Sequence, residues 1–222
     1  PVPWVFLVSI RSWNSSADQK GEEKLLTDYR TPMSETLRTP AVWGSLALFF
    51  VYTGIELLVG VWVYSLLVES RGVPPAQAGA LTGSYWAMFT VGRFLAGLFA
   101  HRFSSTKLLW AGMLLALLGS AVLASNQGVA SSLVGVGMVG FAIAPIFPAL
   151  VSGTRGRVGA KHTANTIGMQ IGAAGLGATL IPGGAGVLAQ RTSLESVPWM
   201  LVVLCVVLIG LVGALPARAQ ST

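Results

Sequence analysis

The sequence from Ala41 to Val68 reads AVWGSLALFFVYTGIELLVGVWVYSLLV, an apolar stretch of 28 residues with one acidic side chain, Glu56, near its middle. A helix needs about 20 mostly apolar residues to cross the hydrocarbon core of a bilayer, so this stretch is long enough. An ionisable group at mid-bilayer costs at least about 2.5–3.5 kcal/mol. The stretch therefore predicts a transmembrane helix with a polar function inside the membrane.

Five further apolar stretches follow, and each is long enough to span a bilayer. They lie at about Pro75–Ala100, Leu108–Ser125, Ser131–Val151, Thr163–Ala189 and Ser196–Leu215. Their apolar runs are continuous rather than alternating, which excludes the strands of a membrane β-barrel. We therefore predict an all-α membrane protein in which residues 41–216 form a bundle of six transmembrane helices.

The composition agrees with a protein embedded in a lipid bilayer. Only 10% of the 222 residues are charged, whereas soluble domains carry about 25%. The net charge of +6 comes from short basic clusters between apolar stretches, without interleaved aromatic residues, so we predict no nucleic-acid partner. A single cysteine, two histidines in different loops and one intramembrane carboxylate provide neither a metal site nor catalytic machinery. We therefore expect neither an enzyme nor a bound cofactor.

The two ends of the chain differ from the apolar stretches. Residues 1–10 are apolar but too short to span a bilayer, and we interpret them as the tail of a preceding transmembrane helix. Residues 11–40 hold five basic and five acidic side chains and predict a solvated linker, with a short helix near Ser34–Arg38. Residues 217–222 would form a short tail. The chain is thus expected to lack an N-terminal six-helix half with which it would pair.

Lysine and arginine are distributed unequally between the predicted loops. Eleven of the 14 lie in the linker, in the loops after the second and fourth stretches and at the C-terminus. Arg71 and Arg191 lie in loops on the other side. The positive-inside rule therefore predicts a multi-pass protein of the cell inner membrane, with the linker and C-terminus in the cytoplasm.

Glu56 is the main candidate for a functional residue. It lies 13 residues after Trp43 and 12 before Val68, so about 18–20 Å of helix separates it from either end. Tyr52 lies one turn away on the same face, within a polar and aromatic stripe that would line a water-filled cavity. There the carboxyl group could take up and release a proton. The alternative is an acid that only hydrogen-bonds a neighbouring helix.

Other polar and aromatic side chains within the stretches could recognise a solute. Gln170 and Asn165 carry amide groups that suit a hydroxylated solute, and Trp86 could stack on a sugar ring or an apolar ligand. Each could instead serve packing or hydrogen bonding between helices. Arg93 lies seven residues before Ala100, about 10 Å from that end of its helix. We interpret Arg93 as an anchor whose stem reaches the membrane interface.

Glycine and proline are expected to shape the later stretches. Gly168 and Gly172 form a G-x-x-x-G pair, a pattern that lets membrane helices approach closely. Pro145, Pro148 and Pro182 are predicted to interrupt the fourth and fifth stretches.

Two segments resemble a known transporter family. Leu37–Trp43 followed by Tyr52–Glu56 resembles the beginning of the seventh helix of major facilitator superfamily transporters, in the fucose- and glucose-permease-like branch. Ala164–Gln170, continuing through Pro182 and Gly186, resembles the eleventh helix of that branch. The resemblance covers the whole chain. It implies the C-terminal half of a twelve-helix fold, built from two inverted three-helix repeats.

The resemblance implies alternating-access transport of a small solute such as a sugar, either proton-coupled or facilitated. Glu56 would then bind the proton or the solute hydroxyls, Gln170 and Asn165 would provide polar recognition, and Tyr52 and Trp86 would stack on the solute. Two other functions fit the same residues. One is an exporter of lipophilic or drug-like compounds from the same superfamily. The other is a non-transporting sensor or assembly subunit, in which Glu56 would be locked to a partner helix.

Overall fold

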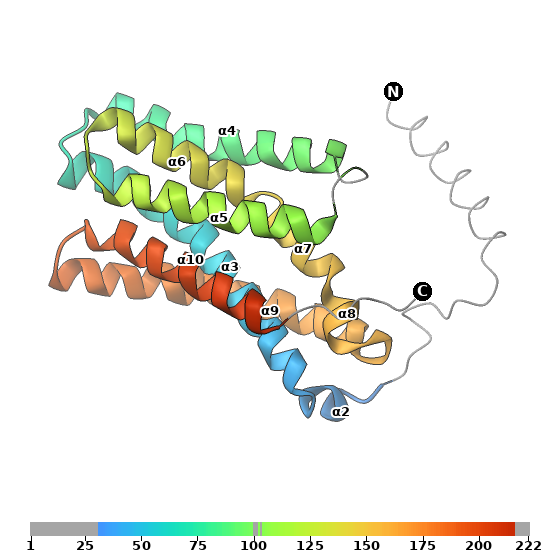
Figure 1. Ribbon diagram of the computed structural model, residues 1–222. Coiled ribbons are helices and arrows are strands. Elements are labelled where there is room, and N and C mark those ends of the chain that lie inside the picture. Colours follow the sequence, from blue (N-terminus) through green and yellow to red (C-terminus); the bar gives the residue numbers. More distant parts are fainter. Residues whose placement is uncertain (1–30, 100–101, 103, 216–222) are drawn as a thin grey trace, which may run out of the picture. The chain divides into compact units, whose positions relative to one another are not determined.

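The computed structural model describes residues 31–99, 102 and 104–215. The predicted tails at 1–10 and 217–222, and residues 11–30 of the predicted linker, lie outside these residues. In the described part of the chain every regular element is a helix (Figure 1). Five are long and apolar enough to cross a membrane: Pro40–Ser70, Ser105–Ala124, Val129–Ser152, Ala160–Arg191 and Ser196–Ala214. The prediction of an all-α protein with several membrane-spanning helices is confirmed.

The first span contains the segment that carries Glu56. Helix α3 (Pro40–Ser65) continues without a break into the π-helical turn η2 (Leu66–Ser70). Proline at the start of α3 removes only an amide that has no partner within the helix. The short linker helix predicted near residues 34–38 is present as α2 (Met33–Leu37).

The second predicted stretch forms helix α4 (Pro75–Phe99). It is 25 residues long but does not appear among the five apolar spans. Polar side chains interrupt its apolar residues, namely Gln77, Thr82, Ser84, Thr90 and Arg93. The count of six spans therefore stays a prediction.

The third and fourth stretches differ from their predicted bounds at polar and proline residues. Helix α5 (Ser105–Ala124) begins three residues earlier than predicted, because the Ser104 hydroxyl accepts a hydrogen bond from the Lys107 amide at 3.3 Å. The fourth stretch is divided at Pro145 into α6 (Val129–Ile143) and α7 (Ile146–Ser152), as predicted. Hydropathy does not predict where a polar residue caps a helix, whereas a break at proline can be predicted from the sequence.

The remaining helices complete the bundle. Helix α8 (Thr154–Val158) is short, and α10 (Ser196–Ala214) is the last span. Helix α9 (Ala160–Arg191) runs for 32 residues straight through Pro182. The predicted interruption at Pro182 is therefore wrong. The carbonyl of Pro182 itself accepts a hydrogen bond from Trp62 Nε1 at 2.9 Å.

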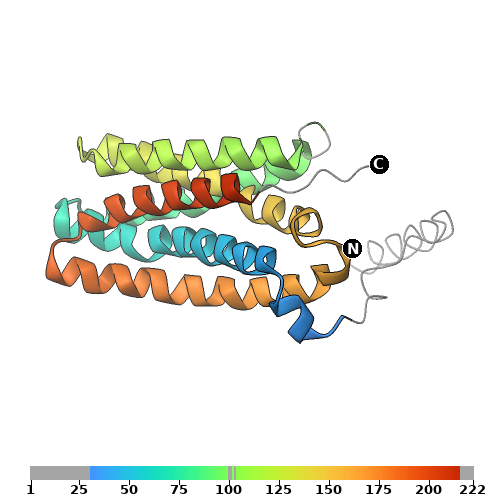
Figure 2. The ribbon, with the colours of Figure 1, turned by 60° about the horizontal axis from the view of Figure 1, so that its bottom comes forward.

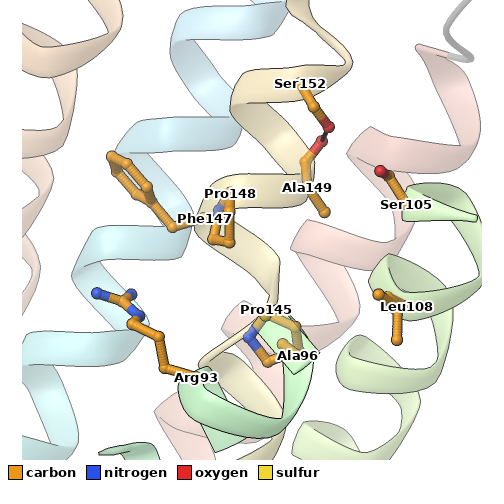
Figure 3. Close-up of a pocket in the computed structure, with 10 residues that line it drawn as sticks. Arg93, Ala96, Ser105, Leu108, Pro145, Phe147, Pro148, Ala149 and Ser152 are labelled. Carbon is orange, nitrogen blue, oxygen red and sulfur yellow. Dashed lines mark hydrogen bonds between the residues drawn. The ribbon is translucent and has the colours of Figure 1, made fainter. Parts of the chain in front are cut away.

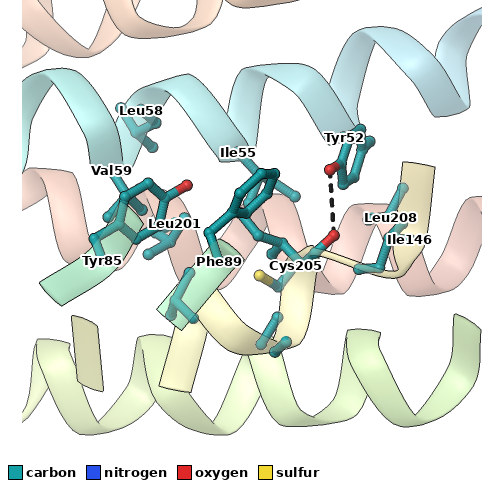
Figure 4. Close-up of a cluster of buried hydrophobic side chains, with 14 of the residues drawn as sticks. Tyr52, Ile55, Leu58, Val59, Tyr85, Phe89, Ile146, Leu201, Cys205 and Leu208 are labelled. Carbon is teal, nitrogen blue, oxygen red and sulfur yellow. Dashed lines mark hydrogen bonds between the residues drawn. The ribbon is translucent and has the colours of Figure 1, made fainter. Parts of the chain in front are cut away.

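The helices pack in specific pairs. Helix α3 contacts mainly α9, α4 contacts mainly α6, and α5 contacts α6 and α10. Helix α10 lies between α5 and α3 (Figure 2). The buried core includes side chains from α3, α4, α7 and α10, and it holds the ring of Tyr52 (Figure 4).

A glycine allows the backbones of α3 and α9 to approach each other closely. A Cβ atom at Gly177 would overlap the carbonyl oxygen of Phe50, so only glycine fits there. In contrast, no described atom lies within 4 Å of the Cβ position at Gly168 or Gly172. The expected close contact at the G-x-x-x-G pair is therefore wrong for the described part of the bundle, where the contact occurs at Gly177.

Candidate functional site

Glu56 lies on the side of α3 that faces α4. The Tyr85 hydroxyl of α4 donates a hydrogen bond to the Glu56 backbone carbonyl at 2.7 Å. The Glu56 side chain is half-buried, so it is neither sealed in the core nor fully exposed. This position leaves the carboxyl group accessible while α4 fixes the backbone beside it.

Tyr52 and Arg93 surround the Glu56 carboxyl group. The Tyr52 hydroxyl and the charged Arg93 guanidinium both lie close enough to influence this group. The Tyr52 hydroxyl also donates to the Ile143 carbonyl at 3.2 Å (Figure 4). Ile143 is the last residue of α6, where carbonyl groups have no partner within the helix. Tyr52 therefore connects the carboxyl group with the break between α6 and α7.

Arg93 does not act as the predicted anchor. Its guanidinium carbon lies 4.5 Å from the centre of the Phe89 ring, one turn earlier on α4. Figure 3 shows the side chain extending from α4 toward α3, beside Phe147. Side chains on a helix tilt toward its N-terminus. An arginine near the C-terminal end of α4 therefore points back along the helix, toward Glu56, and the expected reach to the nearer interface is wrong.

Arg93 also lines an open pocket of 480 Å³. The other lining residues come from α4, α5 and the α6–α7 region (Figure 3): Ala96, Gly97, Ser105, Leu108, Pro145, Phe147, Pro148, Ala149 and Ser152. The wall is mostly apolar, with the arginine as its charged group. The pocket therefore extends the Glu56 cluster into a space that a small ligand could enter.

The two predicted stacking residues have different surroundings. Trp86 is 41% exposed, and a Cβ atom at Gly60 would lie 2.8 Å from its Cζ2 atom. Gly60 follows Glu56 by one turn, so Trp86 packs against α3 one turn away from Glu56. The Tyr52 ring is fully buried and lies 5.9 Å from the Phe147 ring. In this conformation neither the ring face nor the hydroxyl group of Tyr52 is exposed to a solute.

Gln170 and Asn165 lie outside the Glu56 cluster. Gln170 is fully buried, and its Nε2 atom donates to Ser45 Oγ at 2.7 Å and Thr154 Oγ1 at 3.1 Å. Asn165 donates to Thr36 Oγ1 at 3.1 Å and so connects α9 with α2. The structure thus uses both amides to join elements, and it does not bring them together with Glu56.

In the sequence, Tyr85 and Thr90 suggest a stacking wall together with Trp86, but no contact with Glu56, and Arg93 is predicted to be an anchor. A signal for the observed cluster was nevertheless present. Tyr85, Phe89 and Arg93 follow one another at intervals of four residues, which places them on one face of α4. That face could have been predicted, but not the neighbour that it meets. Within residues 31–99, 102 and 104–215, no three His, Cys, Asp or Glu side chains come together as a metal site would require.

Comparison with known proteins identifies the family. Residues 44–221 match the Major Facilitator Superfamily. The chain belongs to this superfamily, and the predicted family is confirmed. Together with the five apolar spans, the match shows a multi-pass membrane protein.

Individual relatives cover most of this chain but only part of their own length. The chain is 25% identical over 206 residues to Bypass of stop codon protein 6 of Saccharomyces cerevisiae, a match that covers 86% of the chain and 41% of the yeast protein. The E. coli fucose:proton symporter FucP has a TM-score of 0.69 at 16% identity, over 99% of this chain and 55% of the symporter. The peptide transporter POT has a TM-score of 0.67 at 17% identity, over 79% and 38% respectively. These two structures show the fold alone.

Proposed function

We propose that this chain forms the C-terminal half of a secondary active transporter, which moves a small solute such as a sugar by alternating access. Transport would be proton-coupled or facilitated, and an N-terminal half would complete the solute pathway. Membership of the Major Facilitator Superfamily supports this class of function. The observation that carries the proposal is the half-buried carboxyl group of Glu56 within the 31-residue span Pro40–Ser70, beside Tyr52 and Arg93.

The pairs of packed helices support two inverted repeats. We take α3, α4 and α5 as one repeat and α6–α7, α9 and α10 as the other. A two-fold axis between the repeats would relate the α3–α9 contact to the α6–α4 contact. It would also relate the α5–α6 contact to the α10–α3 contact, and all four pairs are present.

Protonation of Glu56 would change the hydrogen bonds of Tyr52. A protonated carboxyl group can donate to the Tyr52 oxygen while the phenol donates to the Ile143 carbonyl. An ionised carboxylate can only accept, and it competes with Ile143 for the single phenol proton. We infer that loss of the proton from Glu56 weakens the Tyr52–Ile143 bond and so alters the α6–α7 break, while Arg93 stabilises the carboxylate. This series of hydrogen-bond changes would couple proton binding to helix movement.

The test is a Glu56→Gln substitution in the complete protein, reconstituted in proteoliposomes with an imposed proton gradient. Glutamine keeps the size and hydrogen bonding of the side chain but cannot be ionised. We expect loss of proton-driven accumulation, with solute exchange retained. The matched control is Glu69→Gln at the exposed end of the same span, which should behave as the unmodified protein. Unchanged pH dependence in Glu56→Gln would contradict the proton-carrier role.

A second candidate function is export of lipophilic compounds. The mostly apolar wall of the 480 Å³ pocket beside Arg93 favours it. A thermal-shift panel separates the two solute classes, because sugars should stabilise a sugar carrier and lipophilic cations an exporter. Stabilisation by lipophilic cations alone would reject the sugar proposal.

A further inference from the structure

A second pocket, with three polar side chains in its wall, lies at the end of the bundle where α5 begins and α10 ends. Its volume is 190 Å³, and α3, α5, α7, α8 and α10 contribute to its wall. The polar lining residues are Ser105, Thr106 and Arg157, and the apolar ones include Leu109, Trp110, Val212 and Leu215. Ser105 also lines the Arg93 pocket, whereas Thr106 and Arg157 do not.

Arg157 brings a positive charge into this pocket. Its Nε atom donates to Ser45 Oγ at 3.3 Å, and its Nη2 atom donates to Thr154 Oγ1 at 3.3 Å and to the Leu150 carbonyl. These acceptors are neutral, and no carboxylate of the described residues forms a salt bridge with Arg157. Burial lowers the pKa of Arg157 to about 10, so the group is still protonated at neutral pH. A half-buried cation held by neutral acceptors favours an anionic ligand.

The Nη1 atom of Arg157 is the part of the guanidinium available to a ligand. Among the described residues it has no hydrogen-bond partner. It lies over Gly153, where a Cβ atom would come within 2.6 Å of it. Gly153 also lines the pocket, so Nη1 sits at the pocket wall.

The beginning of α5 adds a second, independent preference for an anion. Ser104 caps the Lys107 amide, whereas the amides of Ser105 and Thr106 have no partner within the helix. The 20-residue helix places the positive end of its dipole at these residues. The exposed hydroxyl groups of Ser105 and Thr106 supply further donors. Arginine together with a helix N-terminus is a common combination for phosphate.

Two apolar stripes lead away from the pocket along the bundle. On α5, Trp110 is followed at intervals of four residues by Leu114 and Leu118, which are 51% and 59% exposed. On α10, Val206 and Val203 lie on the same face as Gly213 and are 53% and 59% exposed. Helices α5 and α10 run side by side (Figure 2), and Trp110 lies 3.9 Å from the Cβ position of Gly213, so the two stripes begin next to each other. Their exposed apolar side chains suit an acyl chain.

We propose that this pocket binds the phosphate group of an anionic membrane lipid, with Arg157 and the first turn of α5 holding the phosphate and the α5–α10 surface holding an acyl chain. The small volume suits a phosphate with part of its glycerol. A zwitterionic headgroup would place its own cation beside Arg157 and bind less well.

The test measures lipid binding to the complete purified protein by native mass spectrometry and by thermal shift. The probes are palmitoyl-oleoyl phosphatidylglycerol, the matching phosphatidylcholine and inorganic phosphate. We expect phosphatidylglycerol to be retained at least tenfold more strongly than phosphatidylcholine, and inorganic phosphate to give no comparable shift. Thr106→Glu should lower phosphatidylglycerol retention at least tenfold, because its carboxylate repels the phosphate. Thr106 is exposed in the first turn of α5, where the helix dipole stabilises an acidic side chain. The variant should therefore fold.

The matched control is Ala130→Glu, which places the same charge in the exposed first turn of α6. It should retain the lipid as the unmodified protein does. The proposal is overturned by equal retention in Thr106→Glu, by equal binding of the two lipids, or by an equal shift with inorganic phosphate, which would identify a free-ion site. Glu56→Gln should keep lipid binding, so failure of the transport proposal can be distinguished from failure of this one.

Discussion

Arg71 illustrates how one side chain can hold several helix ends together. Its side chain is only 5% exposed and donates to both carboxylate oxygens of Glu195, at 2.9 and 2.7 Å. It also donates to Ser132 Oγ at 2.8 Å and to the Leu123 carbonyl at 2.9 Å. The end of η2 is thereby connected to the end of α5, the start of α6 and the turn before α10.

Arg71→Met should destabilise the protein by about 2–4 kcal/mol, because it leaves a partly buried carboxylate and two other acceptors without their donor. Thermal unfolding in detergent measures the change. Arg191→Met, at an exposed position at the end of α9, is the control and should have little effect. Similar losses in the two variants would show that the Arg71 contacts contribute little.

The ion pair also predicts a pH dependence. Hydrogen bonding to Arg71 holds the pKa of Glu195 below its usual value of 4.5. A carboxylate with a lowered pKa in the folded state stabilises the fold above its unfolded-state pKa, and this contribution is lost as the pH falls through the folded-state value. The stability difference between the unmodified protein and Glu195→Gln should therefore be constant above about pH 5 and shrink below about pH 4.5. A constant difference down to strongly acidic pH would contradict this assignment.

At the scale of elements, glycine position decides how closely α3 and α9 pack. Gly177 faces the backbone of α3, whereas Gly175, two residues earlier on the same helix, has no described atom within 4 Å of its Cβ position. A composition argument treats these residues alike. Their structural roles differ because a two-residue step turns about 200° around a helix.

Alanine at the two positions should have opposite effects. Gly177→Ala should destabilise the protein by about 1–3 kcal/mol, because the methyl group overlaps the Phe50 carbonyl and forces the helices apart. Gly175→Ala should be neutral or stabilising by up to about 1 kcal/mol, from higher helix propensity. Thermal unfolding of both variants in the same detergent is the measurement. Equal effects would mean that α3 and α9 are not in close contact there.

At the scale of the whole molecule, the predicted orientation is open to a direct test. The end of the predicted linker is attached to the start of α9, through the Glu35–Lys161 ion pair and a 3.1 Å hydrogen bond between Thr36 and His162. The end of the linker and the basic loop before α9 therefore belong to one end of the bundle. The positive-inside rule places that end in the cytoplasm.

Cysteine labelling of intact cells can check the orientation. The single native cysteine, Cys205, is buried and should give little background. Ser193→Cys, in the exposed turn before α10, should react with a membrane-impermeant maleimide from outside. Ser34→Cys, exposed on α2, should react only after permeabilisation. The reverse pattern would invert the proposed topology.

The helices and the family follow from local sequence. A continuous apolar run of sufficient length has few alternatives to a membrane helix, because lipid cannot satisfy backbone hydrogen bonds. Glu56 stands out for the same reason, as the one acid within those runs. The bounds of α5 and the continuity of α9 through Pro182 were less predictable, since capping and neighbouring groups decide them.

The partners of each polar side chain depend on helix rotation and packing, which the sequence of one helix does not contain. Tertiary structure placed Tyr85 and Arg93 of α4 at Glu56, and it used Gln170 and Asn165 to join helices elsewhere. The sequence thus determined a membrane bundle with one unusual carboxyl group. Only packing decided which side chains surround that group, because those contacts join residues that are distant in the chain.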